Sequence, residues 1–139
     1  MAVLEYPYLA YKSVHLPLIP ITIGSNLVVY ALVDSGATVS LFEAKVAEAL
    51  NINLARGKKR LLTGIGGRIL AYEHRIMIRI GPDRFPCRIC FSPELKVSFN
   101  LLGQEDFFDH FTVTLIKRQK TLRLESLSNP SRPAASAAR

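Results

Sequence analysis

An apolar run that ends on a carboxylate constrains this chain more than any other feature. Residues 27–33 read Leu-Val-Val-Tyr-Ala-Leu-Val and lead directly into Asp34-Ser35-Gly36-Ala37. Such a continuous β-branched and aromatic run predicts a strand that is buried on both faces. A carboxylate at the end of a buried strand is costly unless hydrogen bonds satisfy it. Gly36 allows a backbone N–H to approach Asp34 closely, and Ser35 offers a hydroxyl for a second contact. Because Asp, Ser and Gly are also common turn residues, the tripeptide taken alone fits a simple turn as well.

Two later segments fit the same scheme, although each also has an ordinary interpretation. Gly64-Ile65-Gly66-Gly67 lies between apolar flanks and predicts a mobile hairpin tip. A phosphate-binding loop is the competing interpretation, but the Gly-Lys-Ser/Thr ending is missing and no helix is predicted to follow. Asn100-Leu101-Leu102-Gly103 also fits a strand that ends at a glycine before a short helix.

The rest of the pattern is mostly β, with turn residues between short apolar runs. Pro17 and Pro20 each remove a ladder donor, which places the first strand near a sheet edge or gives it a bulge. Short helices are predicted at residues 43–50 and 104–109, and turns at 24–26 and 81–84. The predicted strands are residues 14–23, 27–33, 68–80, 85–91, 97–102 and 111–116.

The length and composition bound the remaining possibilities. A chain of 139 residues with 49% hydrophobic and 21% charged residues fits one folded domain. Apolar runs stay well below the ~20 residues that cross a bilayer, so no membrane association is expected. The first ten residues lack a basic segment followed by an apolar one, and the cytoplasm is the expected compartment. Residues 128–139, rich in Ser, Pro and Ala, are predicted to be a disordered tail.

The net charge of +7 raises the question of an acidic partner. The densest basic groups, residues 58–60 and 117–120, lack the interleaved aromatic residues of a single-strand binder. We therefore expect a solvated basic surface, and a basic all-β nucleic-acid binder remains the weaker alternative class.

The cysteines and histidines give no sign of a metal site. Cys87 and Cys90 cannot form a four-ligand zinc site alone, and on a strand they would point to opposite faces as buried structural thiols. His15, His74 and His110 are isolated and share no metal-ligand spacing. Neither a metal nor another cofactor is predicted.

Taken together, the three glycine-containing motifs resemble the retropepsin-like aspartic protease family. Members carry, in this order, Asp-Ser/Thr-Gly-Ala after an apolar strand, a glycine-rich flap, and two aliphatic residues plus Gly before a short helix. Here these are Asp34-Ser35-Gly36-Ala37, Gly64-Ile65-Gly66-Gly67 and Leu101-Leu102-Gly103. The resemblance covers about residues 14–127. It implies an all-β, closed barrel of the acid protease fold, with one or two short helices and one lobe per chain. Residues 1–13 form a separate N-terminal segment, which is a candidate for the subunit interface.

The resemblance implies an aspartic endopeptidase that hydrolyses a polypeptide substrate. Aspartic proteolysis uses two carboxylates that share one proton, and a second lobe does not fit in this length. The dyad would therefore consist of Asp34 and its symmetry mate in a homodimer. In this family Ser35 would bond across the interface, Gly36 would present its N–H to the carboxylate, and residues 64–67 would close over the substrate.

One departure from the family pattern concerns the dimer. Many members have Arg after the aliphatic-aliphatic-Gly motif, and in retroviral members it pairs with an Asp one residue past the catalytic tetrapeptide. This chain has Gln104 and Thr38 at those positions. A neutral contact between them could replace the ion pair. A catalytically silent retropepsin-fold dimer that binds peptides or serves as a scaffold is the main alternative to an enzyme.

Overall fold

A computed structural model of the chain describes residues 3–64, 67–95 and 99–127. Strands dominate these residues, as the apolar runs predict, and the predicted tail at 128–139 lies outside them. The elements in chain order are β1 (Val3–Pro7), β2 (Leu9–Tyr11), β3 (Val14–Leu16), β4 (Leu18–Ile23), β5 (Leu27–Val33), β6 (Ser40–Glu43), α1 (Ala44–Ala49), η1 (Leu54–Arg56), β7 (Lys58–Gly64), β8 (Gly67–Ile80), β9 (Asp83–Ser92), β10 (Asn100–Leu102), η2 (Gln104–Phe108), β11 (Phe111–Ile116), η3 (Lys117–Gln119) and β12 (Thr121–Ser126).

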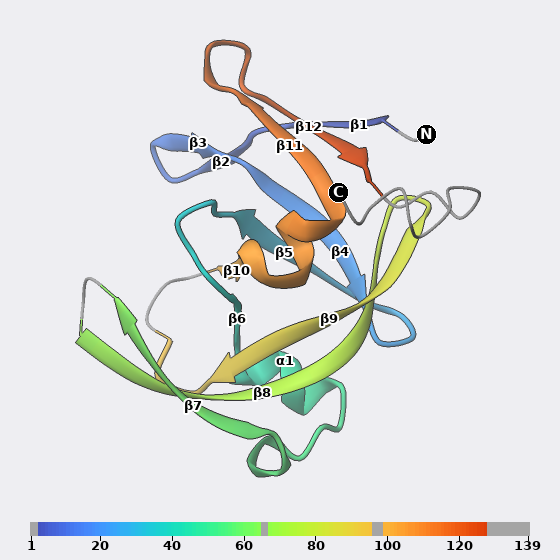
Figure 1. Cartoon of the computed structure of the whole chain (residues 1–139). Helices are drawn as coiled ribbons and strands as arrows, with labels where there is room; N and C mark the ends of the chain where they lie inside the picture. Colours follow the sequence, from blue (N-terminus) through green and yellow to red (C-terminus); the bar gives the residue numbers. More distant parts are fainter. Residues whose placement is uncertain (1–2, 65–66, 96–98, 128–139) are drawn as a thin grey trace, which may run out of the picture.

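The main sheet closes on itself into a barrel. Its strands are ordered β4-β5-β10-β6-β9-β8-β7, and β4 also pairs with β8 through Thr22 and Ile23. This extra pairing joins the first strand, β4, to the C-terminal part of β8, and it leaves the other part of β8 and its partner β7 extending beyond the barrel as a hairpin (Figure 1). The predicted all-β, single-lobe barrel is thus confirmed.

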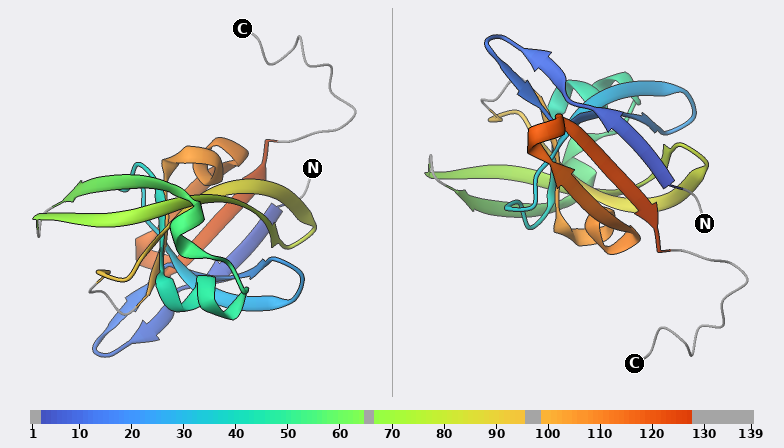
Figure 2. Two further views of the ribbon diagram at one scale, coloured as in Figure 1. Left: turned by 90° about the horizontal axis from the view of Figure 1, so that it is seen from below. Right: turned by 90° about the horizontal axis from the view of Figure 1, so that it is seen from above.

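A second, three-stranded sheet has the order β1-β12-β11. The N-terminal strand β1 pairs antiparallel with β12, so the two ends of the described chain lie side by side (Figures 1 and 2). The short hairpin β2–β3 connects this sheet to the barrel strand β4. The strands predicted from the sequence did not include residues 3–11 or 121–126, which form β1, β2 and β12.

Two predictions about the strands were wrong. The expected strand at residues 14–23 is divided into β3 and β4 at Pro17, which cannot donate to a ladder. The run at residues 27–33 is one strand with the predicted bounds, but it is not buried on both faces: on the inner face only Ala31 and Val33 are fully buried. Val28 and Tyr30 are 56% and 51% exposed, because nothing in the described chain covers the outer face of β5 at that end.

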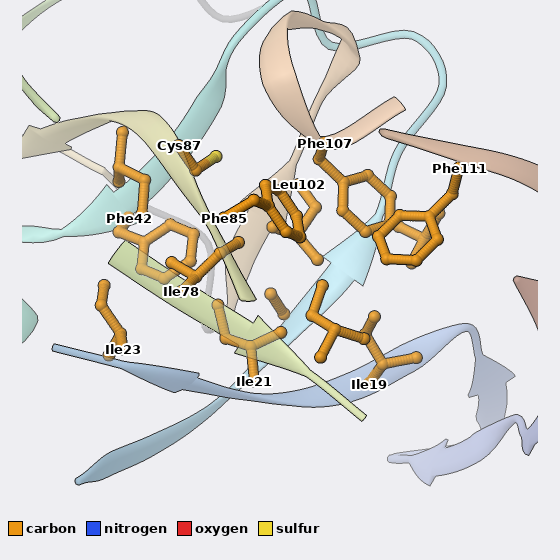
Figure 3. Packing of buried hydrophobic residues seen from close by; sticks show 14 of the residues in the cluster. Ile19, Ile21, Ile23, Phe42, Ile78, Phe85, Cys87, Leu102, Phe107 and Phe111 are labelled. Carbon is orange, nitrogen blue, oxygen red and sulfur yellow. The ribbon is translucent and has the colours of Figure 1, made fainter. Parts of the chain in front are cut away.

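The core fills the barrel and the space beneath the second sheet (Figure 3). Alternate residues of β4 point inward, so that Ile19, Ile21 and Ile23 are fully buried, as period-two strand geometry requires. Aromatic rings close one end of this core, where Phe85, Phe107 and Phe111 meet. The core extends beneath β10 and so supports the segment that binds the Asp34 loop.

Candidate active site

The loop after β5 holds the Asp34 carboxylate in one orientation. The Gly36 N–H donates a hydrogen bond to Asp34 Oδ1 at 2.9 Å, which is the contact predicted from the sequence. The Ala37 N–H donates to the Asp34 carbonyl at 3.1 Å and closes a tight turn. Asp34 is half-buried, while Ser35 and Gly36 are exposed. In the described part of the chain, neither Asp34 Oδ2 nor the Ser35 hydroxyl takes part in a hydrogen bond.

The strand β10 anchors the start of this loop. β10 lies between β5, to which it is parallel, and β6, to which it is antiparallel. The Asp34 N–H donates to the carbonyl of Leu102 at 3.0 Å, so the start of the loop is tied to the end of β10. The next residue, Gly103, has room for no side chain, because a Cβ there would lie 2.6 Å from the Val39 carbonyl carbon and 2.8 Å from the Ala37 carbonyl oxygen. The glycine of the third motif therefore permits two backbone segments to touch.

The turn η2 braces the loop from the other side. Gln104 N–H donates to the Ala37 carbonyl at 2.9 Å, and Glu105 N–H donates to the Thr38 carbonyl at 3.0 Å. The Gln104 side chain donates from Nε2 to the Ser35 carbonyl at 2.8 Å. The proposed side-chain contact between Gln104 and Thr38 was therefore wrong. Instead, the amide spans the loop within the same chain, because the Ser35 carbonyl points toward it. The predicted helix at 104–109 is an irregular π-type turn with non-helical backbone at Glu105 and Asp106.

A groove of about 870 Å³ lies between this loop and the β7–β8 hairpin. The hairpin register pairs Gly64 with Gly67, so the glycine motif forms a hairpin end as predicted; Ile65 and Gly66 lie outside the described residues. Most residues that line the groove are apolar, and Arg60, Arg68 and Glu94 are the charged ones. The lining includes Ala37 and Leu101 beside the loop and Leu62 and Ile69 on the hairpin. The groove therefore suits an extended chain with apolar side chains.

Ion pairs surround the site without reaching Asp34. Arg60 on β7 lies 2.6 Å from Glu73 on β8, and Arg88 on β9 binds both carboxylate oxygens of Asp106. The hydrogen bonds from Arg88 hold the pKa of Asp106 below its ordinary value. The pKa of Arg88 is raised in return, chiefly by its hydrogen bond to Asp106.

Two buried polar residues near the loop were missed by sequence reasoning. Asn100 accepts from the Glu43 N–H at 3.0 Å and donates to the Tyr30 carbonyl at 3.1 Å, and so links three barrel segments. Ser40 is fully buried and its hydroxyl accepts from the Gly103 N–H at 3.1 Å. Only the polarity of Asn100 within an apolar stretch hinted at such a role, and Ser40 gave no signal.

The cysteines occupy the two faces of β9, as the spacing predicts. Cys87 lies in the barrel core, and Cys90 packs with Val39 and Ala71 beneath the groove. Burial raises the pKa of Cys87 to about 12 and that of Cys90 to about 11, so both are inert thiols at neutral pH. Among the described residues, no group of His, Cys, Asp and Glu could hold a metal ion. None of the helices in the described ranges is long and apolar enough to span a membrane.

Comparisons with known proteins agree with this geometry. A family model described as aspartyl protease matches residues 19–105, which is more than half of the chain. A retropepsin-like aspartic protease from Rickettsia conorii superposes with a TM-score of 0.68 at 19% identity, covering 86% of this chain and 98% of that one. The EIAV protease, in a complex with the inhibitor HBY-793, superposes with a TM-score of 0.57 at 18% identity, covering 73% of this chain and 93% of that one. No curated protein matches the sequence. The match to residues 19–105, which contain Asp34 and its supporting loop, shows that the chain belongs to the aspartyl protease family.

Proposed function

We propose that this chain is an aspartic endopeptidase that acts as a homodimer, with Asp34 of each subunit forming the catalytic dyad. The observation that carries the proposal is the Asp34 carboxylate, held by the Gly36 N–H in a loop that borders the groove. Family membership supports peptide-bond hydrolysis as the reaction.

The need for a second subunit follows from the other aspartates. Asp106 binds Arg88, Asp83 lies 3.0 Å from His110, and Asp109 accepts the Asp106 N–H. Each of these carboxylates is committed to a contact elsewhere in the fold, so Asp34 has no partner for a dyad within its own chain. A twofold axis beside Asp34 supplies the second carboxylate from an identical loop.

The reaction then needs one proton shared between the two carboxylates. The ionised carboxylate takes a proton from water while the water oxygen attacks the scissile carbonyl carbon. The protonated carboxylate gives its proton to the carbonyl oxygen, which yields a neutral gem-diol. When the gem-diol collapses, the C–N bond breaks, one hydroxyl proton returns to the dyad, and the leaving nitrogen takes a proton from it. No covalent acyl-enzyme forms and no cofactor takes part.

The supporting roles follow the family resemblance and the local geometry. Ser35, whose hydroxyl is exposed beside Asp34, would bond across the interface to its counterpart. The hairpin ending at Gly64 and Gly67 would close over the substrate, whose backbone would pair with strand edges while apolar side chains enter the groove. Leu101 lines that groove, and Leu102 and Gly103 position the loop.

The first test compares the purified chain with the variant Asp34→Asn on a mixture of denatured proteins, with new peptide ends counted by mass spectrometry. Cleavage should disappear in the variant, while its circular dichroism and sedimentation remain those of the wild type. Cleavage that persists in Asp34→Asn would refute the assignment. If neither protein cleaves but both sediment as dimers, the chain is the silent peptide-binding alternative.

A second test examines the shared dyad. Wild-type chain is equilibrated with excess Asp34→Asn chain above the dimer dissociation constant, and heterodimer is quantified by native mass spectrometry. Because a heterodimer has one carboxylate, activity per wild-type chain should fall in proportion to heterodimer formed. Abundant heterodimer with undiminished activity would show that one Asp34 suffices.

A further inference from the structure

Two acidic residues of the turn η2 face arginines of the barrel strands. Asp106 has φ of +69° and ψ of −48°, close to the rare and strained geometry at the centre of a classic γ-turn. It is held there by Arg88, whose Nε donates to Oδ2 at 2.9 Å, whose Nη2 donates to Oδ1 at 3.1 Å, and whose backbone N–H donates to Oδ2 at 2.7 Å. The position of η2 is therefore fixed against β9 by a charged, two-pronged contact.

The neighbouring residue Glu105 reaches toward the β7–β8 hairpin. Its Oε1 lies 3.6 Å from Arg60 Nη1 on β7 and 4.0 Å from Arg88 Nη1. Arg60 in turn contacts Glu73 on β8 at 2.6 Å, so it belongs firmly to the hairpin. Arg60 also lines the groove. The side chains of Arg60 and Glu105 are 28% and 39% exposed, so their attraction is partly shielded from water.

The backbone of Glu105 at the same time supports the loop of Asp34. Its N–H donates to the Thr38 carbonyl at 3.0 Å, next to the bond from Gln104 N–H to the Ala37 carbonyl. Glu105 therefore contacts both walls of the groove, the loop wall through its N–H and the hairpin wall through its carboxylate.

We propose that Glu105 is a positioning residue that, through Arg60, sets the spacing between the β7–β8 hairpin and the Asp34 loop, and with it the width of the substrate groove. The ion pair between Glu105 and Arg60 limits how far the β7–β8 hairpin moves away from the Asp34 loop. Its effect on catalysis rests on the proposed peptidase function, whereas its effect on the two walls does not. An extended substrate is gripped between these walls, so the link acts on substrate binding.

Glu105→Gln tests the link, because it preserves the side-chain length and the backbone N–H but removes the charge. Glu73→Gln is the matched control, since it removes the other carboxylate that contacts Arg60 and leaves the bridge between the walls. Arg60→Gln removes the same link together with the Glu73 contact, so it should reproduce the effect of Glu105→Gln at the Asp34 loop, and the double variant should be no worse there than Arg60→Gln alone. That result would assign the effect to Arg60 and not to Arg88.

Amide hydrogen exchange gives a readout that needs no activity. In Glu105→Gln, exchange should accelerate about two- to fivefold in both walls, at Leu61–Thr63 and at Gly36–Ala37, which is the range expected for a half-exposed ion pair. In Glu73→Gln it should accelerate in the hairpin alone. Unchanged exchange at Gly36–Ala37 in Glu105→Gln would overturn the proposal, whether or not the chain cleaves peptides.

Kinetics on a cleaved peptide separate positioning from simple destabilisation. A loss of folded enzyme lowers kcat and leaves KM unchanged, whereas a widened groove should raise KM about two- to fivefold in Glu105→Gln and in Arg60→Gln. An equal rise of KM in Glu73→Gln, or a change in kcat alone, would contradict the role of Glu105.

Discussion

Replacing Gly103 by alanine should destabilise the chain and distort the Asp34 loop. The added Cβ would lie 2.6 Å from the Val39 carbonyl carbon and 2.8 Å from the Ala37 carbonyl oxygen, with the Val39 carbonyl oxygen closer still. These atoms belong to the backbone, so no side-chain rotation relieves the contact. The backbone around Gly103 must therefore move away from the Asp34 loop, which weakens the bonds from Gly103 N–H to Ser40 Oγ and from Gln104 N–H to the Ala37 carbonyl. Two hydrogen bonds of about 1 kcal/mol each and about 1–3 kcal/mol of overpacking should together lower the free energy of unfolding by roughly 3–5 kcal/mol.

The assay is urea unfolding followed by circular dichroism, with Gly64→Ala as the control. A Cβ at Gly64 meets no atom within 4 Å, so this variant should stay within about 0.5 kcal/mol of the wild type. A loss of 3 kcal/mol corresponds to a fall in Tm of roughly 10 °C for a domain of this size. If Gly103→Ala costs less than about 1 kcal/mol, or if both variants lose equally, the close approach of β10 to the loop is not what requires the glycine.

The remaining predictions concern the ion pair between Asp106 and Arg88, the two buried thiols and the side-chain amide of Asn100. Because the pKa of Asp106 is lowered in the folded chain, its carboxylate stabilises the fold above the ordinary carboxyl pKa of about 4 and loses this effect as the pH falls through the folded-state value. Asp106→Asn should therefore flatten the acid limb, that is, the fall in the free energy of unfolding between about pH 5 and pH 2 as measured by urea unfolding. Arg88→Gln should flatten the same limb, and an unchanged limb in both variants would contradict the contact. Cys87 and Cys90 should resist alkylation at pH 8 in the native chain and react fully in urea, as mass spectrometry would show; rapid native labelling of either would mean that β9 is not buried. Asn100→Ala should lower the free energy of unfolding in urea by about 2 kcal/mol, because it removes two partly buried hydrogen bonds, from the Glu43 N–H and to the Tyr30 carbonyl. A cost below about 0.5 kcal/mol would show that water replaces the amide.

The sequence alone was sufficient to predict the structure of segments whose own residue pattern decides it. The strands at residues 27–33 and 111–116 have the predicted bounds, and the helix predicted at 43–50 is α1 at Ala44–Ala49. The hydrogen bond from Gly36 to Asp34 could be predicted because it joins residues two positions apart and depends on the absence of a side chain. Local periodicity and local sterics explain these successes.

Features that depend on distant segments could not be predicted in this way. An apolar run does not reveal how many layers cover it, which is why the exposed side chains of Val28 and Tyr30 were misjudged. The partner of Gln104 was wrong because the choice between Thr38 and the Ser35 carbonyl depends on the path of the loop, not on residue types. The ion pair between Arg60 and Glu105 likewise joins β7 to a turn that follows three strands later.

The insertion of β10 between β5 and β6 has a consequence for when the site forms during folding. Hydrogen bonds that define the loop and its support join residues 63, 69 and 70 positions apart in the chain. Closing such long segments costs conformational entropy before any contact repays it, and non-local pairing of this kind folds slowly. A growing chain exposes Asp34 long before β10 exists to hold its loop. The geometry of the loop, and any activity that depends on it, should therefore appear among the last events of folding, after the β8–β9 hairpin is complete.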